Sequence, residues 1–388
     1  MDGGDRLTIE IVDRIAAVAA ADWDSCAGSA NPFVTHAFLA ALEESGSVGG
    51  RTGWLPYHLV ARDAAGAVVG AAPMYLKGHS YGEYVFDHGW AQAYTRAGGR
   101  YYPKLQVSVP FTPVPGPRLL VRPDAAPAVR LALIDGLGEV ARRRKVSSLH
   151  VTFCTDAEKD AFAEAGWLIR EGYQFHWHNA NYASFDDFLA TLSHGRRKAI
   201  KRERREVAAQ GITMEIATGT ALTTAHWDAF FDFYIATSER KWGDPYLTRR
   251  FFEILGATMG DRVALVLARK DGRWVGGALN LVGDDAIYGR NWGCRGDFPF
   301  LHFEACYYQA IEYAIVRGLA RVEAGAQGEH KLSRGYMPRA TWSAHYILDP
   351  GFRAAVADFL RRETTVVTQE IDALAEHGPF RHDPDSGA

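Results

Sequence analysis

The sequence predicts an α/β protein built from two similar halves. Segments with a helical spacing of apolar residues alternate with short runs that are typical of strands. The order helix, hairpin, helix, strand occurs twice along the 388 residues. The two hairpins also share a phrase, which is GAVVGAAPMYL in the first half and GRWVGGALNLV in the second. These observations indicate a degenerate internal duplication with its seam near residues 175–184.

In the first half, each expected element has a local signal. The AAG turn joins two apolar runs into a hairpin, and the basic end RRRK suits the negative end of a helix dipole. The stretch YYPKLQVSVPFTPVPGPRLL has too many prolines to be a central strand throughout, so we expect an extended wall with Lys104 and Arg118 as its charged points. In order, we expect a strand at 7–12, a helix at 32–45, a hairpin within 56–77, a helix at 124–145, a strand at 147–153, a helix at 157–167 and a strand through 174–177.

The second half repeats this order with longer helices. Tight turns at Asp271-Gly272 and at 283–285 divide one long apolar stretch into three strands, and Gly318 ends the helix that follows. The C-terminal helix, 352–377, is expected to pack across the second core. In order, we expect helices at 193–211, 224–242 and 248–260, with a strand at 212–219 after the first, then three strands within 262–294, a helix at 301–319 and a strand at 320–326.

The resulting division has two domains, residues 1–178 and residues 179–377, followed by a disordered tail at 378–388. A chain of 388 residues is long enough for two hydrophobic cores. We expect a monomer or a weak dimer.

Composition excludes several classes of protein. A net charge of −3 gives no general attraction to nucleic acid. The four cysteines include no CxxC pair, so neither a zinc site nor a disulfide framework is expected. The polar start MDGGDRLTIE is unlike a signal peptide, and no apolar run approaches the ~20 residues of a membrane span. We therefore expect a cytoplasmic protein. This expectation is compatible with peripheral association at the inner face of the membrane.

The loop AGAQGEHKLSRGYMP carries the densest polar chemistry of the chain. It follows the expected strand at 320–326, and ligands of open α/β sheets bind at the carboxyl ends of strands. Glu329 or His330 could take a proton from an amine, while Lys331 or Arg334 could hold an oxyanion or a phosphate. A solvated polar loop is the alternative, although the small residues before it allow close approach to the backbone.

The start of the helix at 301–319 supplies two further candidates, His302 and Glu304. An acid at a helix start also interacts favourably with the helix dipole, so capping is an alternative for Glu304. Cys306 lies four residues after His302 among apolar neighbours, and we expect a structural thiol there and not a nucleophile.

A block of the first half, LKGHSYGEYVFDHGWA, mixes charged and aromatic residues without a clear period. Its aromatic residues could line an acyl or lipid pocket, and Glu83 or His79 could bind an amine. A metal site is not expected, because no pair has a recognised ligand spacing. The alternative is a hairpin edge with ordinary surface charges. The candidate substrate-binding residues are Lys77, His79, Glu83, Tyr84, Asp87, His88 and Trp90.

The helix segment RRKAIKRERRE has seven basic residues and two acids. On a net-acidic chain this is a local positive patch that could hold the phosphates of coenzyme A, tRNA or an anionic membrane. The alternative is a solvated helix face, and the segment lacks aromatic partners for RNA bases. Arg196, Arg197 and Lys201 are our candidates for contact with donor phosphates.

Four blocks resemble a known family, the proteobacterial FemAB-like group labelled peptidoglycan biosynthesis/recognition. These blocks are HSYGEYVFDHGWA, YYPKLQVSVPFTPVPGPRLL, NWGC with LHFEACYYQAIEYAI, and EAGAQGEHKLSRGYMP, and the resemblance covers about residues 31–360. It implies a tandem GNAT-like (FemAB-like) N-acyltransferase fold with two mixed sheets flanked by helices. The wider resemblance includes bacterial ceramide synthases, which acylate long-chain amino alcohols.

One motif of GNAT enzymes is absent. Their R/Q-x-x-G-x-G/A loop binds the acyl-CoA pyrophosphate, and the corresponding segment GRNWGCRGDFPFLHFE has Arg290 and Arg295 without that spacing. Use of acyl-CoA therefore rests on the resemblance, with these two arginines as candidate phosphate contacts.

Together these observations predict an N-acyltransferase that moves an acyl group from a thioester to an amine of a lipid or cell-envelope precursor. A sphingoid-type amine, giving a ceramide, is the example that the resemblance suggests. The amine would attack the carbonyl directly, without a covalent intermediate or a permanently bound cofactor. The alternatives are transfer from aminoacyl-tRNA to a peptidoglycan precursor and a non-catalytic envelope-binding module.

Overall fold

The computed structural model describes residues 7–240, 245–325 and 328–381, without the side chains of Arg240 and Glu329. Contacts group the chain into two compact units. Unit 1 comprises 1–172, 246–251 and 340–368, and unit 2 comprises 173–245, 252–339 and 369–388. The predicted domain boundary after residue 178 stays a prediction. The contacts between residues show which segments are compact, and they do not show which segments fold independently.

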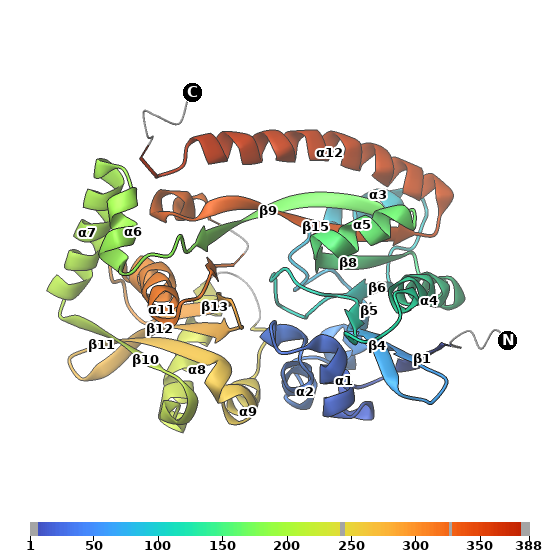
Figure 1. Ribbon diagram of the computed structural model, residues 1–388, viewed down its shortest axis with the longest axis horizontal. Coiled ribbons are helices and arrows are strands. Elements are labelled where there is room, and N and C mark those ends of the chain that lie inside the picture. The colour runs from blue at the N-terminus through green and yellow to red at the C-terminus, as the bar shows by residue number, and fades with distance from the viewer. Residues whose placement is uncertain (1–6, 241–244, 326–327, 382–388) are drawn as a thin grey trace. The chain divides into compact units, whose positions relative to one another are not determined.

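Unit 1 combines two sets of strands with helices (Figure 1). One set is the antiparallel sheet β1-β3-β4-β7, and the other has the order β15-β8-β6-β5-β2. Its elements are β1 (Thr8–Val12), α1 (Ala20–Ala27), α2 (His36–Glu44), β2 (Trp54–Pro56), β3 (His58–Arg62), β4 (Val68–Ala72), β5 (Met74–Lys77), α3 (His88–Arg96), β6 (Lys104–Val107), β7 (Leu120–Val121), α4 (Ala128–Arg144), β8 (Ser148–Cys154) and α5 (Asp156–Glu164). Parts of β9 (Leu168–His178), β15 (Met337–Ile347) and α12 (Pro350–Glu376) complete it.

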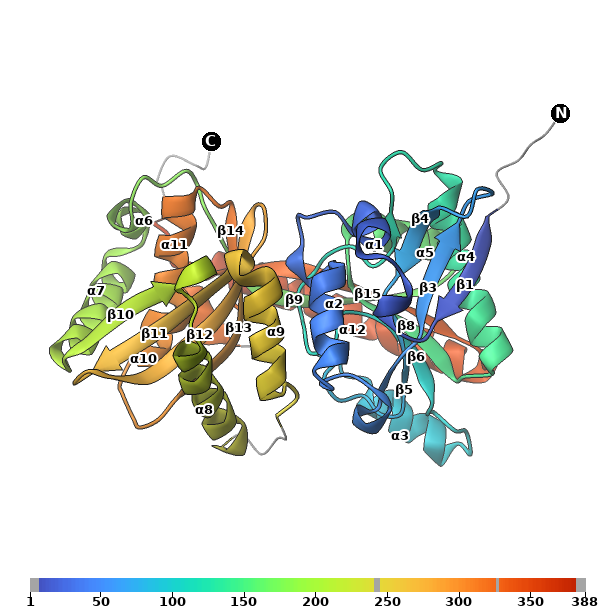
Figure 2. The same ribbon diagram turned by 90° about the horizontal axis from the view of Figure 1, so that it is seen from below.

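Unit 2 is arranged around strands in the order β10-β11-β12-β13-β14-β9, with α8 against β12 and β13 (Figure 2). Its elements are α6 (Phe185–Thr191), α7 (His194–Ala209), β10 (Ile212–Ala217), α8 (Thr224–Arg240), most of α9 (Arg249–Met259), β11 (Val263–Lys270), β12 (Arg273–Val282), β13 (Ala286–Cys294), α10 (Leu301–Phe303), α11 (Gln309–Arg317) and β14 (Arg321–Glu323).

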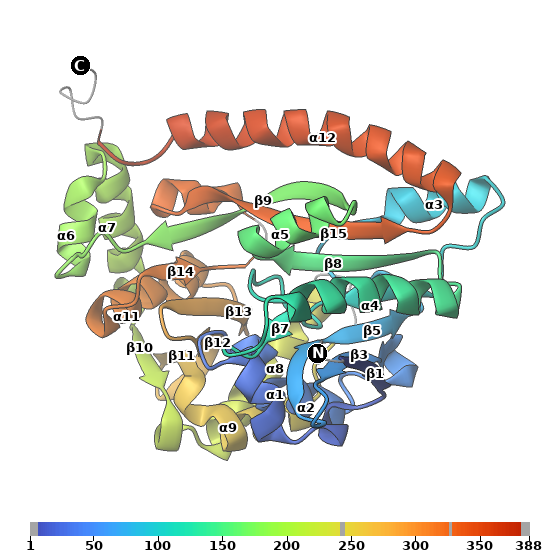
Figure 3. The same ribbon diagram turned by 45° about the vertical axis from the view of Figure 1, so that its right-hand side comes forward.

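The two units repeat one pattern of strand pairing. In unit 2, β13 and β14 are parallel and joined through α11, and in unit 1, β6 and β8 are parallel and joined through α4, which lies along β8 in Figure 3. The next position is filled by an antiparallel strand from the other half of the sequence, β9 beside β14 and β15 beside β8. This repetition agrees with the predicted internal duplication and supports the predicted mixed α/β fold.

The shared hairpin phrase differs between the units because of one proline. GRWVGGALNLV forms the uninterrupted strand β12, whereas Pro73 divides GAVVGAAPMYL into β4 and β5. Proline cannot donate to the strand ladder, so the long strand of unit 2 becomes two strands here. Because β4 and β5 then pair with different partners, unit 1 has two sets of strands where unit 2 has one.

Three local features differ from the sequence expectations. The first part of α12 places Phe352, Val356 and Leu360 in a cluster with Trp90 of unit 1, so the expectation that this helix packs across the second core was wrong for this part. It is confirmed for the end of the helix, where Leu374 packs against the core of unit 2. The charged block before β6 ends in a helix, α3, that was not expected. The helix at 301–319 contains a π-helical segment, Glu304–Tyr308, between α10 and α11.

Residues at the C-terminal end of the described chain also have partners. Phe380 forms an isolated bridge with Leu192, and the amide of Ser193 donates to the carbonyl of Pro379 at 2.9 Å. The rest of the expected disordered tail, 382–388, lies outside the described residues.

Close packing of α8 on β13 requires a glycine at position 293. A Cβ at Gly293 would lie 2.0 Å from the carbonyl oxygen of Phe233, which is backbone and cannot turn away. We expect Gly293→Ala to lower the free energy of unfolding by about 1–3 kcal/mol, as overpacked cores do. Gly195→Ala is the matched control, because its Cβ meets nothing within 4 Å in α7. Urea denaturation of both variants checks this, and equal midpoints for Gly293→Ala and the native chain would contradict it.

Candidate functional site

The loop after β14 places an exposed imidazole beside a second histidine in unit 2. A 3-10 helix, Glu329–Arg334, carries His330, whose Nε2 lies 2.8 Å from the Tyr307 hydroxyl. The ring centroids of His330 and His302 are 6.0 Å apart, so the loop and the start of the helix at 301–319 meet at this pair. A Cβ at Gly328, where φ is +117°, would lie 2.6 Å from the His330 ring. Glycine at 328 therefore allows the observed ring position.

The surroundings of His330 favour its neutral form. Partial burial lowers its pKa, and the positive charges of Arg334 and Lys331 lower it further. Lys331 is 1% exposed, and its Nζ donates to the carbonyl of Gly325 at 2.7 Å. Burial lowers the pKa of Lys331 to about 8. A neutral imidazole is the form that can accept a proton.

Arg334 fixes this loop to the core of unit 2. Its Nη2 donates to Glu203 at 2.8 Å, its Nε to the Tyr308 hydroxyl at 3.0 Å and its Nη1 to the carbonyl of His330 at 2.8 Å. The guanidinium also lies 3.5 Å from the centroid of the Phe303 ring. These bonds hold Arg334 inside the fold, and the contact with an oxyanion or phosphate expected for Arg334 and Lys331 stays a prediction.

His302 and Glu304 lie at the helix start, as the sequence predicts, but have different neighbours. His302 belongs to the aromatic group around His330. Glu304 is 4% exposed and accepts bonds from both Arg204 (3.0 Å) and Gln309 (2.8 Å). The structure therefore brings His302, and not the carboxylate of Glu304, to His330 in an observed contact. A role for Glu304 as base stays a prediction.

Glu329 and Cys306 are the other two residues of the predicted mechanism. The side chain of Glu329 lies outside the described part of the chain, so its role as a base stays a prediction. Cys306 is half-buried in the π-helical segment and packs against the cluster of Val266, Ala278 and Ala305. This apolar packing is consistent with the structural role expected for the thiol.

Glu323, the last residue of β14, was not among the residues predicted from the sequence. Its carboxylate is 4% exposed, accepts from Nε of Arg321 at 2.8 Å and lies 3.9 Å from Nε2 of His176. Burial raises the pKa of Glu323 to about 7, although Arg321 opposes this shift. Its Oε2 has no hydrogen-bond partner among the described residues. An acid within a buried strand, in ARVEAGA, is the signal that could have identified it.

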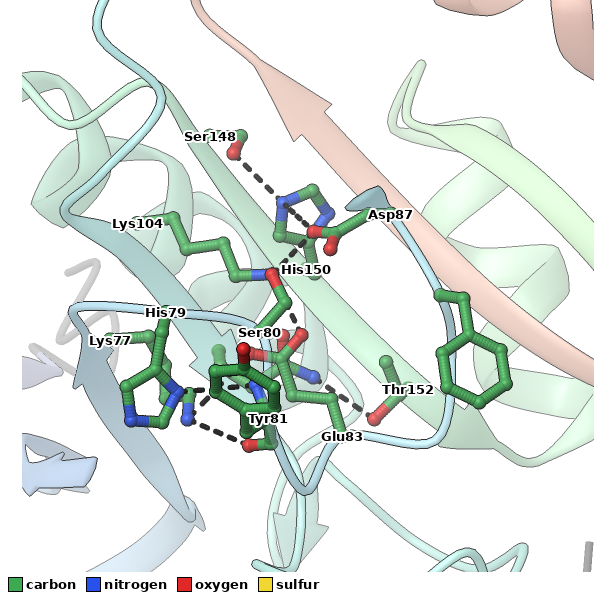
Figure 4. Close-up of polar contacts among 12 residues, drawn as sticks. Lys77, His79, Ser80, Tyr81, Glu83, Asp87, Lys104, Ser148, His150 and Thr152 are labelled. Atoms are coloured by element: carbon green, nitrogen blue, oxygen red, sulfur yellow. Dashed lines mark hydrogen bonds and ion pairs between the residues drawn. The ribbon is translucent and has the colours of Figure 1, made fainter. Parts of the chain in front are cut away.

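In unit 1, the charged block of the first half forms a buried cluster of ion pairs (Figure 4). Lys104 on β6 is fully buried and donates to Glu83 at 2.7 Å and to Asp87. Lys77 on β5 is also fully buried, 3.8 Å from Glu83 and 3.4 Å from the ring centroid of Trp54. Both carboxylates are less than 5% exposed, at 4% for Glu83 and 3% for Asp87.

Burial and pairing divide the charges within this cluster. Burial alone would raise the pKa of Asp87, but Lys104 and His150 hold it well below its ordinary value. Burial would lower the pKa of Lys104, but Glu83 and Asp87 raise it. Burial lowers the pKa of Lys77 to about 7 and raises that of Glu83 to about 7. Lys104 and Asp87 therefore form the firmly charged pair, and Lys77 and Glu83 titrate near neutral pH.

A chain of hydrogen bonds continues from Asp87 through unit 1. The Tyr101 hydroxyl donates to Asp87 at 2.6 Å and lies 3.1 Å from Nε2 of His150. Nδ1 of His150 lies 2.7 Å from Nδ1 of His345, whose Nε2 lies 3.0 Å from the Ser343 hydroxyl. Burial lowers the pKa of His150 to about 3, so this chain is neutral beyond Asp87. Its members come from two loops and from strands β8 and β15, which sequence spacing could not connect.

The other residues of the expected substrate-binding set lie around this cluster. His79 is held between the carbonyl of Thr52 (2.9 Å) and a backbone amide, and burial lowers its pKa. Tyr84 is half-buried with φ of 60°, His88 is exposed at the start of α3, and Trp90 is 6% exposed. The paired, buried charges give the cluster a structural role, and direct contact of its members with substrate stays a prediction.

The basic helix α7 borders a groove in unit 2. The groove has a volume of about 490 Å³, and Arg197, Lys198 and Lys201 line it together with Phe185 and His194. Lys201 also lies 2.9 Å from Asp186. Arg204 is held by Glu304 and Glu312 at 3.0 and 2.9 Å, so pairing with these two carboxylates accounts for this basic residue.

The remaining candidates for donor phosphates do not line this groove. Arg196 is exposed on α7 outside its lining. Arg290 lies on β13, and Arg295 forms an exposed ion pair with Asp232 of α8. Only part of the predicted phosphate-binding set is therefore brought together, and its function stays a prediction.

Comparison with known proteins identifies the family and confirms the fold. A family model for FemAB-like proteins of peptidoglycan biosynthesis/recognition matches residues 14–382. The crystal structure of FemX has a TM-score of 0.56 at 13% identity, covering 90% of this chain and 100% of that chain. L-PGS from Bacillus licheniformis has a TM-score of 0.52 at 10% identity, with 86% and 98% coverage. The C-terminal domain of a putative lysylphosphatidylglycerol synthetase from Agrobacterium fabrum has a TM-score of 0.53 at 10% identity, with 90% and 97% coverage.

At these identities the likeness concerns the fold, and it confirms the predicted FemAB-like, tandem GNAT-like architecture. No curated protein matches the sequence.

Proposed function

Because the chain belongs to the FemAB-like family of peptidoglycan biosynthesis/recognition, we propose that it is an N-acyltransferase that acts on an amine of a lipid or cell-envelope precursor. The observation that carries this proposal is the exposed, neutral imidazole of His330 beside the Tyr307 hydroxyl. Acyl transfer to an amine needs a base of this kind, since most amines are protonated at neutral pH.

The proposed reaction is a direct transfer. When Nε2–H of His330 donates to the Tyr307 oxygen, Nδ1 carries the lone pair and accepts the proton of the substrate ammonium. The free amine then attacks the thioester carbonyl, its nitrogen releases the excess proton to water, and the tetrahedral oxyanion collapses to an amide and a thiolate. The thiolate takes up the proton held by His330, which returns the imidazole to its neutral form. The π-helical segment that carries Tyr307 is a type of distortion frequent at functional sites.

A lipid acceptor is consistent with the family and with one similar structure, whose name denotes a lysylphosphatidylglycerol synthetase. We propose a long-chain amine, such as a sphingoid base that would give a ceramide, and work at the inner face of the membrane. Across the described residues, no helix is both long and apolar enough to span a bilayer. Acyl-CoA is the proposed donor.

Transfer from aminoacyl-tRNA is the second candidate, and the basic groove on α7 favours it. A polyanionic donor would be attracted by Arg197, Lys198 and Lys201. The two donors differ in how salt affects them, because a tRNA that neutralises many cations loses affinity steeply as ionic strength rises. Acyl-CoA has fewer phosphates and a smaller salt dependence.

We expect the triple variant Arg197→Gln, Lys198→Gln, Lys201→Gln to raise KM for acyl-CoA at least roughly tenfold at low salt, with little change in kcat, because charge-assisted bonds to phosphate are lost. Arg202→Gln is the control, since this exposed residue pairs with Glu206 and does not line the groove. An unchanged KM in the triple variant would make α7 a solvated face only.

The proposed function is tested by incubating the purified chain with palmitoyl-CoA or with charged tRNA and a panel of amines. The panel contains sphinganine, phosphatidylethanolamine and a muramoyl pentapeptide. We expect release of coenzyme A and a new long-chain amide by mass spectrometry. Turnover of charged tRNA alone would favour the second candidate, and binding of an amine without consumption of any donor would favour a non-catalytic module.

A further inference from the structure

Unit 1 contains a second hollow that the proposed chemistry does not use. It has a volume of about 840 Å³ and lies between α3 and the first part of α12. Figure 3 shows these two helices near each other. The volume is in the range of small-molecule sites, which are mostly apolar with a few polar groups.

The floor of this groove is aromatic and its walls are small. Trp90, Phe352 and Val356 line it and are 6%, 8% and 3% exposed. Ala93 and Ala355 line the facing helices and leave room where larger side chains would fill it. Phe86 and Phe359 also line it, yet they are 58% and 39% exposed. Large exposed aromatic residues gathered at one hollow indicate a binding surface.

The interior of the groove and the end lined by residues 97–99 differ in charge. The lining residue Arg170 donates to Glu363 at 2.6 and 2.7 Å and to the carbonyl of Phe86 at 2.7 Å, so its charge is satisfied. The interior thus complements an uncharged chain.

Residues 97–99 line one end of the groove, and Arg96 and Arg100, which adjoin them in the sequence and are exposed, form no ion pair with another described residue. Asp349 is the one carboxylate among the lining residues, and it accepts from the amide of Phe352 at 2.6 Å. Because the two arginines outnumber this carboxylate, we infer that this end complements an anionic group.

We propose that this groove binds the hydrocarbon chain of an anionic fatty-acyl compound, with the acidic group toward Arg96 and Arg100. A chain of methylene groups gains free energy by leaving water along the floor of Trp90 and Phe352. As the site for the donor's acyl chain, the groove rests on the proposed acyl transfer. As a binding site, it is tested without any turnover.

The test is calorimetric titration of the full chain with laurate, decanoate and dodecanol below their aggregation limits. Laurate is expected to bind at one site, and decanoate more weakly by roughly fourfold for each methylene removed. Arg96→Gln with Arg100→Gln is expected to weaken laurate severalfold and to leave dodecanol unchanged. Equal loss for both probes, or no chain-length dependence, would overturn the proposal.

A matched pair of variants places the ligand. Ala355→Trp fills the groove and is expected to weaken laurate at least roughly tenfold. Ala354 immediately precedes Ala355 and does not line the groove. The variant Ala354→Trp is therefore expected to bind laurate as the native chain does. Binding that survives Ala355→Trp would overturn the assignment to this groove.

Sedimentation distinguishes the other occupants. If the native chain is a dimer that Ala355→Trp dissociates, the groove is an interface between two copies and the proposal fails. If the native chain binds phosphatidylcholine vesicles but not free laurate, the exposed aromatic residues contact a bilayer, and the proposal also fails. Neither result bears on acyl transfer at His330, which is measured separately with a soluble short-chain thioester.

Discussion

Replacing His330 with glutamine is expected to lower kcat/KM for acyl transfer by about 10²–10⁴-fold, the usual loss when a positioned base is removed. Glutamine keeps a hydrogen-bonding group near Tyr307 but cannot accept a proton at neutral pH. Far-ultraviolet circular dichroism and a thermal melt should match the native chain, because the side chain is exposed. A fully active, folded variant would show that the base lies elsewhere, and Glu323→Gln would be the next variant to measure.

The pH dependence of the native chain gives an independent check. Because the pKa of His330 lies below its ordinary value, the neutral base persists at neutral pH, and kcat/KM should fall only as the pH drops through that lowered pKa. The acidic limb should disappear in His330→Gln. Tyr307→Phe is a second control, since it removes the hydroxyl bonded to Nε2 and should reduce the rate less than loss of the base.

Replacing Lys104 with methionine is expected to lower the free energy of unfolding by about 3–5 kcal/mol, the usual result of removing one partner of a buried ion pair. The substitution leaves Glu83 and Asp87 buried with Lys77 as the nearest remaining cation. The unfolding of unit 1 is measured in a urea titration, with hydrogen exchange of the backbone amides of β6 and β8 as the probe. Arg143→Met, which breaks an exposed pair with Glu139, is the control and should change little.

The effect of Lys104→Met should depend on pH in a definite direction. In the native chain, the pKa of Asp87 lies below its ordinary value. The charged carboxylate therefore stabilises the fold fully at any pH above the ordinary pKa. This stability is lost as the pH falls through the lowered pKa. Without Lys104 the carboxylates protonate more readily, so the loss should shrink as the pH falls. The triple variant Lys104→Met, Glu83→Gln, Asp87→Asn should recover, at neutral pH, part of the free energy of unfolding that Lys104→Met loses. A loss that is independent of pH would point to packing instead of charge.

Local signals in the sequence predicted much of the fold, and they selected His302 and His330 as separate candidates. The turn at Asp271-Gly272 and the stop at Gly318 lie where strands and helices end in the structure. His302 and His330 lie close together because a short strand and a 3-10 helix connect the helix to the loop. Signals of this kind depend on neighbouring residues, which a sequence displays directly.

Features that depend on distant partners could not be predicted in this way. Asp87 and Lys104 look like surface charges until the loop before β6 brings Tyr101 to them, and β8 and β15 bring His150 and His345. The apolar residues of α12 show that this helix packs, but not that its first part belongs to unit 1 and its end to unit 2. Glu323 was missed because its burial follows from the pairing of β14 with both β13 and β9.

Acyl transfer itself is tested most directly by measuring both products of one reaction. The purified chain is mixed with palmitoyl-CoA and sphinganine, and free coenzyme A and the amide are quantified at each time by thiol titration and mass spectrometry. We predict equal amounts of the two products, formation only when both substrates are present, and a rate at least about 10²-fold lower in His330→Gln. Coenzyme A released without amide, or an acyl group trapped on Cys306, would contradict direct transfer to the amine.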